Sequence, residues 1–327
     1  MGKDSEFVPV VDLSAARNGS GGRRGRTSVA REIGRACESS GFFTVVGHGI
    51  PAELTGRMDA VTREFFRLPA PRKEKVLCGP GKGGLRYAEG SVARGAGGDA
   101  PPDLCEIYTA NVLGDLAPER RARCGGADAP WTRANDWPEE PAGFRDVWTA
   151  YMRAMGGLGG DLMRLFALAL GLDEEFFDDK VDRHVSTLVA NHYFPPSGPP
   201  LPGQMRMGAH SDWGSLTILL RDAVGGLQVR RDGEWHDVPH VPGGFVINIG
   251  DLMAFWTNGH WVSTVHRVRN PAEGTTDSRL SLPFFFLPNH DTRIEPLPRF
   301  RKSGDRDRVT GTTPGEWFRA KMAATYS

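Results

Sequence analysis

Apolar residues recur every three or four positions in two long stretches of the first half of the chain. This spacing places them on one side of an α-helix, so each stretch predicts a helix that buries one face. Four glycines interrupt the second stretch. Because each costs about 1 kcal/mol relative to Ala in a helix, they predict either a kink or close packing against another backbone. The stretches are residues 53–67, with Leu54, Met58, Val61, Phe65 and Phe66, and residues 144–166, with Phe144, Val147, Trp148, Tyr151, Met155, Leu158, Leu162, Leu165 and Phe166, broken by Gly156, Gly157, Gly159 and Gly160.

The first fifty residues alternate short apolar runs with one Gly- and Arg-rich segment. Residues 8–13 and 42–46 are short and apolar, which predicts strands, and the apolar positions around Ile33 predict a helix between them. Residues 17–26 read RNGSGGRRGR, a composition that predicts a turn before that helix.

After about residue 184 the pattern changes to short β-rich runs separated by Gly, Pro and Asn. Many short strands with turn signals predict a barrel or a sandwich, and no repeat of fixed period is visible. The runs are STLVANHYF, SLTILL, GLQV, FVINIG, LMAFW, STVHRV and RLSLPFFFL. We therefore expect one compact unit with four segments: an N-terminal region at 7–125, a helical brace at 126–183, a β core at 184–290 and a C-terminal segment at 291–327.

Composition narrows the class of protein. Hydrophobic residues make up 39% of the 327 residues, enough for a full core. The 40 Lys and Arg residues balance the 40 Asp and Glu residues, so no field of one sign exists to attract nucleic acid or an anionic membrane. The four cysteines form no Cys-X-X-Cys pair, and no run of 18 apolar residues occurs. The first residues, MGKDSEFVPVVDLS, show no apolar segment with a small-residue cleavage site, so we expect no export. We expect a cytoplasmic protein with reduced thiols and a small-molecule substrate; the oligomeric state is left open.

Glycine and proline crowd residues 78–103, which include GPGKGG and RGAGGDAPPD. Such a segment cannot form a regular element cheaply, so it predicts either a surface loop or a lid over a substrate pocket. Tyr87 and Arg94 lie within it and are candidate pocket residues. An inward-pointing Arg94 would favour a substrate with a carboxylate.

His210 and Asp212 are the first candidates for chemistry. They lie two residues apart where the chain enters the strand SLTILL, and in an extended chain such side chains share one face. With His266 from STVHRV they would complete a facial triad, the ligand set of non-haem iron(II) oxygenases. His260 is the main rival third ligand, although its TNGH context favours a loop. The other histidines weighed as rivals are interpreted as structural, at His48, or as surface groups, at His184, His236, His240 and His290.

Arg279 and Ser281 share one face of an apolar run that should be buried. A buried guanidinium needs a partner. A ligand carboxylate held by the arginine and the serine hydroxyl is one candidate, and an internal ion pair is the other. Asn191 and Tyr193 also alternate to one face of their strand and could contact the same ligand.

Together these segments resemble the isopenicillin N synthase-like branch of the iron(II)/2-oxoglutarate oxygenases over nearly the whole chain. The resemblance implies a mainly β fold with flanking helices and a distorted double-stranded β-helix, or jelly-roll, core. Residues 7–125 would be the N-terminal dioxygenase-type region. The motifs, which occur in the family's order, are VPVVDLS, GFFTVVGHGIP, FFRLP, NHYFPP, MGAHSDWGSLTILL, GGLQV, INIGD, TNGHWVSTVHRV and RLSLPFFFLPN.

The resemblance also implies roles for single residues. His210, Asp212 and His266 match the ligands of Fe(II) and so the catalytic centre. Arg279 and Ser281 match the pair that holds the distal carboxylate of 2-oxoglutarate, assisted by Tyr193, and Asn191 matches a position near its metal-chelating end. The candidate substrate-pocket residues are Tyr87, Arg94, Trp213, Trp256 and Phe285.

The implied reaction consumes O₂ and 2-oxoglutarate and hydroxylates, desaturates or cyclises a small molecule. Enrichment in Arg, Ala and Gly suggests a GC-rich bacterial genome and natural-product metabolism. Two alternatives remain open. One is an iron oxidase, like isopenicillin N synthase itself, that does not use 2-oxoglutarate; the other is a binding protein that keeps the fold without catalysis.

Overall fold

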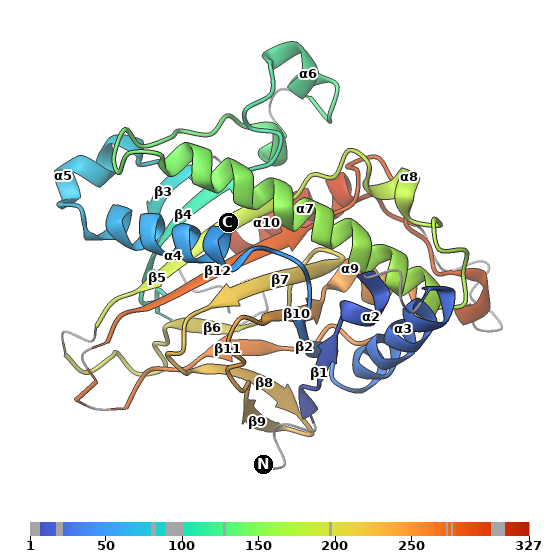
Figure 1. The fold of residues 1–327 in the computed structure, drawn as a ribbon. Coiled ribbons are helices and arrows are strands. Elements are labelled where there is room, and N and C mark those ends of the chain that lie inside the picture. The colour runs from blue at the N-terminus through green and yellow to red at the C-terminus, as the bar shows by residue number, and fades with distance from the viewer. Residues whose placement is uncertain are drawn as a thin grey trace.

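The computed structural model describes residues 7–17, 22–79, 83–88, 101–126, 129–195, 198–272, 274–275, 277–301 and 311–326. Two β-sheets form a jelly-roll core, and helices cover the larger one (Figure 1). The large sheet has the order β1-β2-β10-β7-β12-β5-β4-β3 and the small sheet β6-β11-β8-β9. The strands are β1 Val10–Asp12, β2 Phe42–Val46, β3 Gly84–Tyr87, β4 Cys105–Asn111, β5 Thr187–Tyr193, β6 Met207–His210, β7 Leu216–Arg221, β8 Leu227–Arg231, β9 Glu234–Asp237, β10 Phe245–Ile249, β11 His266–Val268 and β12 Arg279–Phe286.

Strand β12 shows how the large sheet separates core from site. It pairs antiparallel with β5 and β7, so that Ser281 lies opposite both Asn191 and Arg221. Alternate side chains point to opposite faces. Leu282 and Phe284 belong to the main hydrophobic core on the helical side, and Ser281, Asn191 and Arg221 therefore face the small sheet. The candidate site residues Asn191 and Ser281 therefore lie on this inner face.

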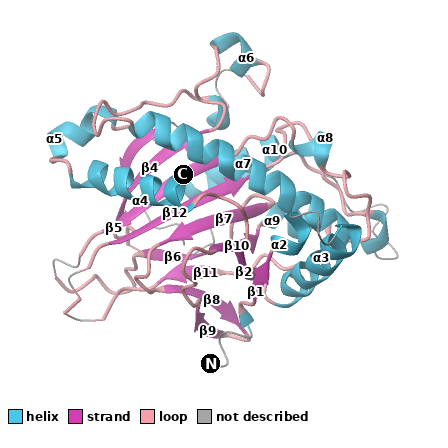
Figure 2. Ribbon diagram, in the orientation of Figure 1, coloured by secondary structure: helices cyan, strands magenta, loops and turns pink. Residues whose placement is uncertain are grey.

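The outer face of the large sheet is covered by helices (Figure 2). The long helix α7 crosses it and packs against β12 and β7. An added Cβ at Gly159 would lie 2.6 Å from the Phe286 ring, and one at Gly156 would lie 3.0 Å from His184. These two glycines of α7 thus serve close packing, but against side chains and not against another backbone as expected. The helices are α2 Ser14–Arg17, α3 Gly22–Ser39, α4 Ala52–Arg67, α5 Ala70–Lys73, α6 Pro118–Ala122, α7 Phe144–Ala169, α8 Asp178–Val181, α9 Asp251–Trp256 and α10 Pro314–Tyr326, with 3₁₀ turns at Glu74–Val76, Pro130–Thr132 and Pro298–Phe300.

The turn predicted at residues 17–26 is wrong for its second part. Helix α3 already begins at Gly22 and includes Arg23, Arg24 and Arg26. Arginine is a good helix former, and Val29, Ile33 and Cys37 bury one face of α3, so packing outweighs the local cost of Gly25. The predicted strand at 42–46 is confirmed as β2.

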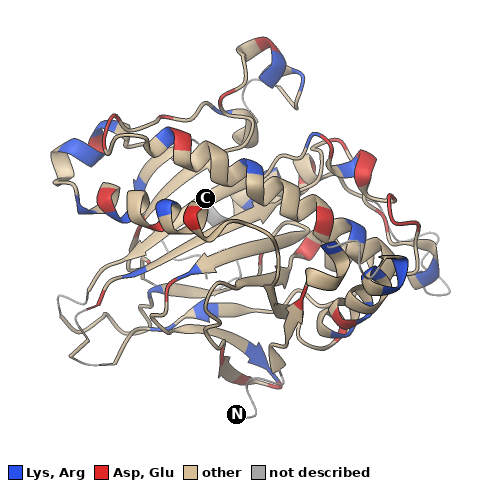
Figure 3. Ribbon diagram, in the orientation of Figure 1, with Lys and Arg blue, Asp and Glu red and all other residues tan. Residues whose placement is uncertain are grey.

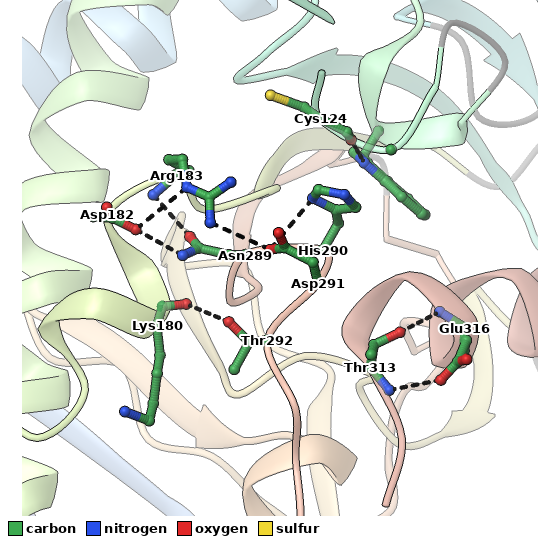
Figure 4. A network of polar contacts seen from close by, with 12 residues as sticks. Cys124, Lys180, Asp182, Arg183, Asn289, His290, Asp291, Thr292, Thr313 and Glu316 are labelled. Atoms are coloured by element: carbon green, nitrogen blue, oxygen red, sulfur yellow. Dashed lines mark hydrogen bonds and ion pairs between the residues drawn. The ribbon is translucent and has the colours of Figure 1, made fainter. Parts of the chain in front are cut away.

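The C-terminal segment runs back over the core and ends in α10. Asn289 holds its beginning, because the Asn289 side chain accepts a hydrogen bond from Arg183 N (2.7 Å) and donates one to Asp182 (2.6 Å). Thr313 and Glu316 form reciprocal hydrogen bonds of 3.0 and 3.2 Å across the first turn of α10 (Figure 4). This capping box fixes where the helix begins.

Charged side chains lie mostly on the helices, the connecting segments and the strand ends, and the middle of the large sheet carries few of them (Figure 3). Among the described helices, none is both long and apolar enough to cross a membrane. Of the predicted loop or lid at 78–103, residues 80–82 and 89–100, including Arg94, lie outside the described residues.

Candidate functional site

His210, Asp212 and His266 converge at the end of the small sheet. His210 ends β6 and lies directly opposite His266, the first residue of β11. Their ring centroids are 4.3 Å apart. The Oδ1 atom of Asp212 lies 3.8 Å from Nε2 of His210 and 3.7 Å from Nε2 of His266. One ligand atom from each residue therefore falls within 4.8 Å of the others, close enough to hold one metal ion.

Hydrogen bonds orient each of the three side chains. Nδ1 of His210 lies 2.8 Å from the Gly208 carbonyl oxygen, and Nδ1 of His266 lies 3.1 Å from that of Thr264. A carbonyl can only accept, so Nδ1 carries the proton in each ring and the Nε2 lone pair is left for a metal. The site thus offers one Nε2 atom from each imidazole as a potential metal ligand.

Two hydrogen bonds to Oδ2, the carboxylate oxygen that faces away from the histidines, hold Asp212 in place. Oδ2 accepts hydrogen bonds from Thr217 Oγ1 at 2.5 Å and from Asn248 Nδ2 at 2.6 Å. Both donors come from the inner face of the large sheet, where Asn248 pairs with Thr217 across β10 and β7. Oδ1 is thereby directed toward the two imidazoles.

The loop that carries Asp212 is fastened to the start of α9. Asp251 N donates to the Asp212 carbonyl oxygen at 2.8 Å, and Leu252 N donates to that of Gly214 at 3.2 Å. Gly250 makes this contact possible, because an added Cβ would lie only 2.2 Å from the Gly214 carbonyl oxygen. The INIGD motif therefore positions the carboxylate from outside the loop that bears it.

Electrostatics favour a metal-binding protonation state. Burial, followed by the neighbouring His266, lowers the pKa of His210 to about 4, so His210 is neutral near pH 7. Burial alone would raise the pKa of Asp212. The two imidazoles and the hydrogen bonds from Asn248 and Thr217 outweigh it and hold the pKa of Asp212 below its ordinary value.

Arg279, Ser281 and Tyr193 form a second buried group on the inner face of the large sheet. Arg279 pairs with Tyr193 across β12 and β5, and the guanidinium carbon lies 5.0 Å from the Tyr193 ring centroid. Arg279 Nε donates to the Val224 carbonyl oxygen at 3.3 Å, whereas its Nη1 is buried with no hydrogen-bond partner. A buried donor without a partner is costly, so this group fits an anionic ligand.

A cavity of about 230 Å³ adjoins the candidate metal-binding cluster of His210, Asp212 and His266. Of the predicted pocket residues, Trp213 and Phe285 line it, as does Asn191. Trp256 instead packs against Phe177 in the main core, with ring centroids 5.0 Å apart. Tyr87 donates a hydrogen bond to Glu74 at 2.9 Å and does not line this cavity.

Sequence reasoning missed several residues of the site. Thr217 and Asn248 share strand parity with inward-facing neighbours, so strand alternation could have found them once the faces were assigned. Arg86 lines the cavity where its neighbour Tyr87 was proposed. Phe318, Lys321 and Met322 of α10 close one side, and no motif in the C-terminal segment indicates them.

Comparison with protein families gives two matches that together span most of the chain. Residues 185–288 match the 2OG-Fe(II) oxygenase superfamily. Residues 8–140 match the N-terminal region described as non-haem dioxygenase in morphine synthesis.

Individual proteins resemble the chain over most of its length. Validamycin A dioxygenase from Streptomyces hygroscopicus subsp. limoneus is 37% identical over 302 residues, which cover 89% of this chain and 79% of that protein. A full-length Neurospora crassa protein, solved in complex with alpha-KG and thymine, has a TM-score of 0.82 and 26% identity, covering 98% of this chain and 97% of that one. A putative 2OG-Fe(II) oxygenase family protein from Caulobacter crescentus has a TM-score of 0.81 and 29% identity, covering 97% and 98%.

Proposed function

Since the chain belongs to the 2OG-Fe(II) oxygenase superfamily and is a non-haem Fe(II)/2-oxoglutarate dioxygenase, we propose that His210, Asp212 and His266 hold its iron. The observation that carries this assignment is the convergence of ligand atoms from two imidazoles and one carboxylate within 4.8 Å. Two nitrogens and one oxygen on one side of a metal form the ligand set of this enzyme class, with positions left for co-substrate and O₂.

Arg279, Ser281 and Tyr193 would bind the distal carboxylate of 2-oxoglutarate. The support is the buried Nη1 of Arg279, which has no hydrogen-bond partner. A carboxylate placed against it would satisfy the guanidinium and could accept a further hydrogen bond from Ser281. Asn191 lies opposite Ser281 and lines the cavity, a position between the carboxylate site and the metal-binding cluster that suits the chelating end of the co-substrate.

When bound, the iron and 2-oxoglutarate supply an oxidant strong enough to remove hydrogen from carbon. The residues of the chain itself bind and orient the reacting groups and shield them from water. Thr217 and Asn248 keep Asp212 in position, and Trp213 and Phe285 present apolar walls beside the cluster. Apolar walls exclude water and hold a substrate away from reactive side chains.

The substrate would be a small organic molecule that is hydroxylated, desaturated or cyclised. About half of the cavity-lining side chains are apolar, and Arg86, Asn111 and Lys321 are among the polar ones. This lining suits a molecule with an apolar body and a polar or anionic end. Similarity to validamycin A dioxygenase supports a role in bacterial natural-product metabolism. A cytoplasmic location and the division of one compact unit at residues 125, 183 and 290 remain predictions.

Oxygen consumption tests the proposed function directly. The purified protein with Fe(II) should consume O₂ and release succinate only when 2-oxoglutarate is added, and faster with a true substrate. Consumption that depends on substrate but not on 2-oxoglutarate would favour the oxidase. The absence of an absorbance change on anaerobic addition of Fe(II) and 2-oxoglutarate would favour a binding protein without catalysis.

A further inference from the structure

Three arginines lie buried together in the otherwise weakly charged space between the two sheets. The exposed fractions of Arg206, Arg221 and Arg279 are 2%, 7% and 0%. Arginine is almost never so buried unless it is paired with an anion. Only Arg279 belongs to the carboxylate site assigned above, so Arg206 and Arg221 need an explanation of their own.

None of the three is paired with a carboxylate among the described residues. Arg206 donates to the carbonyl oxygens of Phe194 (3.4 Å) and Asp277 (3.0 Å), and Arg221 donates to that of Val238 (2.8 Å). Nε of Arg206 and Nε of Arg221 are buried without a hydrogen-bond partner, as is Nη1 of Arg279. Each of the three buried guanidinium groups therefore has at least one N–H without a hydrogen-bond acceptor.

Arg206 and Arg221 each lie near Arg279. Arg221 lies opposite Ser281 across β7 and β12 and so faces the same side as Ser281 and Arg279. Arg206 contacts the residue after Tyr193 and the residue two before Arg279, which ties it to the ends of β5 and β12. Burial, followed by the charge of Arg279, lowers the pKa of Arg206 and lowers the pKa of Arg221 to about 10.

The nearest carboxylate along the chain is already engaged. Asp222 follows Arg221 but accepts hydrogen bonds from Arg63 (2.7 Å) and from Leu280 N (2.7 Å). The charge of Asp222 acts to raise the pKa values of Arg206 and Arg221, but Asp222 forms no hydrogen bond with either. A buried positive charge left without an anion is strongly unfavourable, so a ligand with a negative group would relieve it.

We propose that Arg206, Arg221 and Arg279 form one three-guanidinium receptor for the distal carboxylate of 2-oxoglutarate. The proposal rests on the assignment of Arg279 and Ser281 made under Proposed function and extends it to two arginines outside that motif. The receptor makes binding depend on the second carboxylate of the co-substrate, because a 2-oxo acid without it leaves the guanidiniums uncompensated. Arg206 and Arg221 are thus determinants of co-substrate specificity and affinity.

Calorimetric binding to the Mn(II)-loaded protein tests the receptor with two ligands. One is 2-oxoglutarate; the other is 2-oxovalerate, which has a methyl group in place of the distal carboxylate. Arg206→Gln and Arg221→Gln should each weaken 2-oxoglutarate binding by about tenfold or more and change 2-oxovalerate binding by less than about twofold. Arg221→Lys, which keeps the charge, should recover part of the loss.

Arg26→Gln is the matched control. Arg26 also has a buried Nε without a partner, but it forms an ion pair with Glu174 on the helical side of the molecule. This variant should lose thermal stability and bind both ligands as the wild type does. Metal-free Arg206→Gln and Arg221→Gln should instead melt no lower than the wild type, since they lose an uncompensated charge.

The outcomes separate the receptor from the function on which it rests. If both ligands weaken equally in Arg206→Gln and Arg221→Gln, these arginines only support the fold and the proposal is overturned. A wild-type preference for 2-oxoglutarate that survives unchanged in both variants overturns it as well. If the wild type itself does not prefer 2-oxoglutarate to 2-oxovalerate, the carboxylate role of Arg279 fails first.

Discussion

Asn248 donates a hydrogen bond of 2.6 Å to the Asp212 oxygen that faces away from His210 and His266. The donor lies on β10 of the large sheet, whereas both histidines belong to the small sheet. With the hydrogen bond from Thr217 on β7, this contact links the large sheet to the loop that carries Asp212. It also decides which oxygen of Asp212 remains available to a metal.

Replacing Asn248 with Ala should weaken metal binding without removing a ligand. The Asp212 carboxylate would keep only the Thr217 hydrogen bond, and loss of such a contact typically costs about 10- to 100-fold in metal affinity. Anaerobic Fe(II) titration measures the change. Asn270→Ala, which removes an amide bonded to the Gln204 carbonyl oxygen instead, should leave the affinity unchanged. Equal affinity in Asn248→Ala would show that Thr217 alone positions Asp212.

Alanine at His210, Asp212 or His266 should abolish turnover and reduce Fe(II) binding while the fold is retained. Each change removes one of three converging ligand atoms. The control is His260→Ala, because His260 lies beside Glu38, 3.1 Å from its Oε1, and is exposed. Metal content by elemental analysis and circular dichroism give the two readouts. Full iron occupancy in His266→Ala together with loss in His260→Ala would reassign the third ligand.

Arg279→Gln should raise the Michaelis constant for 2-oxoglutarate strongly. Truncating one partner of a buried charge pair costs about 2–5 kcal/mol. Succinate formation at varied 2-oxoglutarate concentration measures the effect. An unchanged constant would mean that Arg279 serves the substrate or the fold.

Strand alternation and motif order in the sequence were sufficient to predict that His210, Asp212 and His266 converge, but not the surroundings of these residues. Their role as iron ligands stays a prediction. His210 and Asp212 could be paired from their spacing, and the jelly-roll class followed from the resemblance. Trp256 is one of the predicted pocket residues, yet on α9 its side chain packs into the main core. The direction of a side chain on a short helix depends on tertiary packing, which no local pattern carries.

His184 illustrates a second limit of prediction from the sequence alone. Charged neighbours in the sequence suggested a surface position, but His184 packs beside Gly156 and lies 5.0 Å from the Phe286 ring centroid. The arginines at 206 and 221 were missed for a related reason. A basic residue at a strand end is usually solvated, and only the facing sheet buries these two.

His184 predicts how stability depends on pH. Burial lowers its pKa from 6.5 to about 4, so the unfolded chain binds more protons between these values. The contribution of the neutral His184 ring to the free energy of unfolding is fully present above about pH 6.5. It is lost as the pH falls toward 4, by an amount on the order of 3 kcal/mol. Urea unfolding of metal-free protein across this range should show a flatter profile for His184→Phe than for the wild type. His260→Phe, at an exposed position, should keep the wild-type profile; a His184→Phe profile of wild-type slope would contradict the prediction.

Helix α10 leads to the last prediction, which concerns coupling of co-substrate turnover to product formation. Phe318 lines the cavity, and its ring centroid lies 5.4 Å from that of Trp213, the residue after Asp212. Lys321 holds the same helix to Asp251 through a contact of 2.8 Å, and Asp251 N in turn bonds to the Asp212 carbonyl oxygen. Helix α10, which forms one wall of the cavity, is therefore connected through Asp251 to the loop that carries Asp212.

Phe318→Ala should open this wall, admit water and let a bound substrate move away from the oxidant. Product formed per succinate should then fall several-fold, whereas succinate formation itself should fall much less. Both quantities are measured in one assay with an accepted substrate. Phe300→Ala is the matched control, since Phe300 packs on His260 away from the cavity and its loss should lower stability without changing the ratio. A parallel fall of product and succinate in Phe318→Ala would mean that α10 supports the fold and does not shape the reaction chamber.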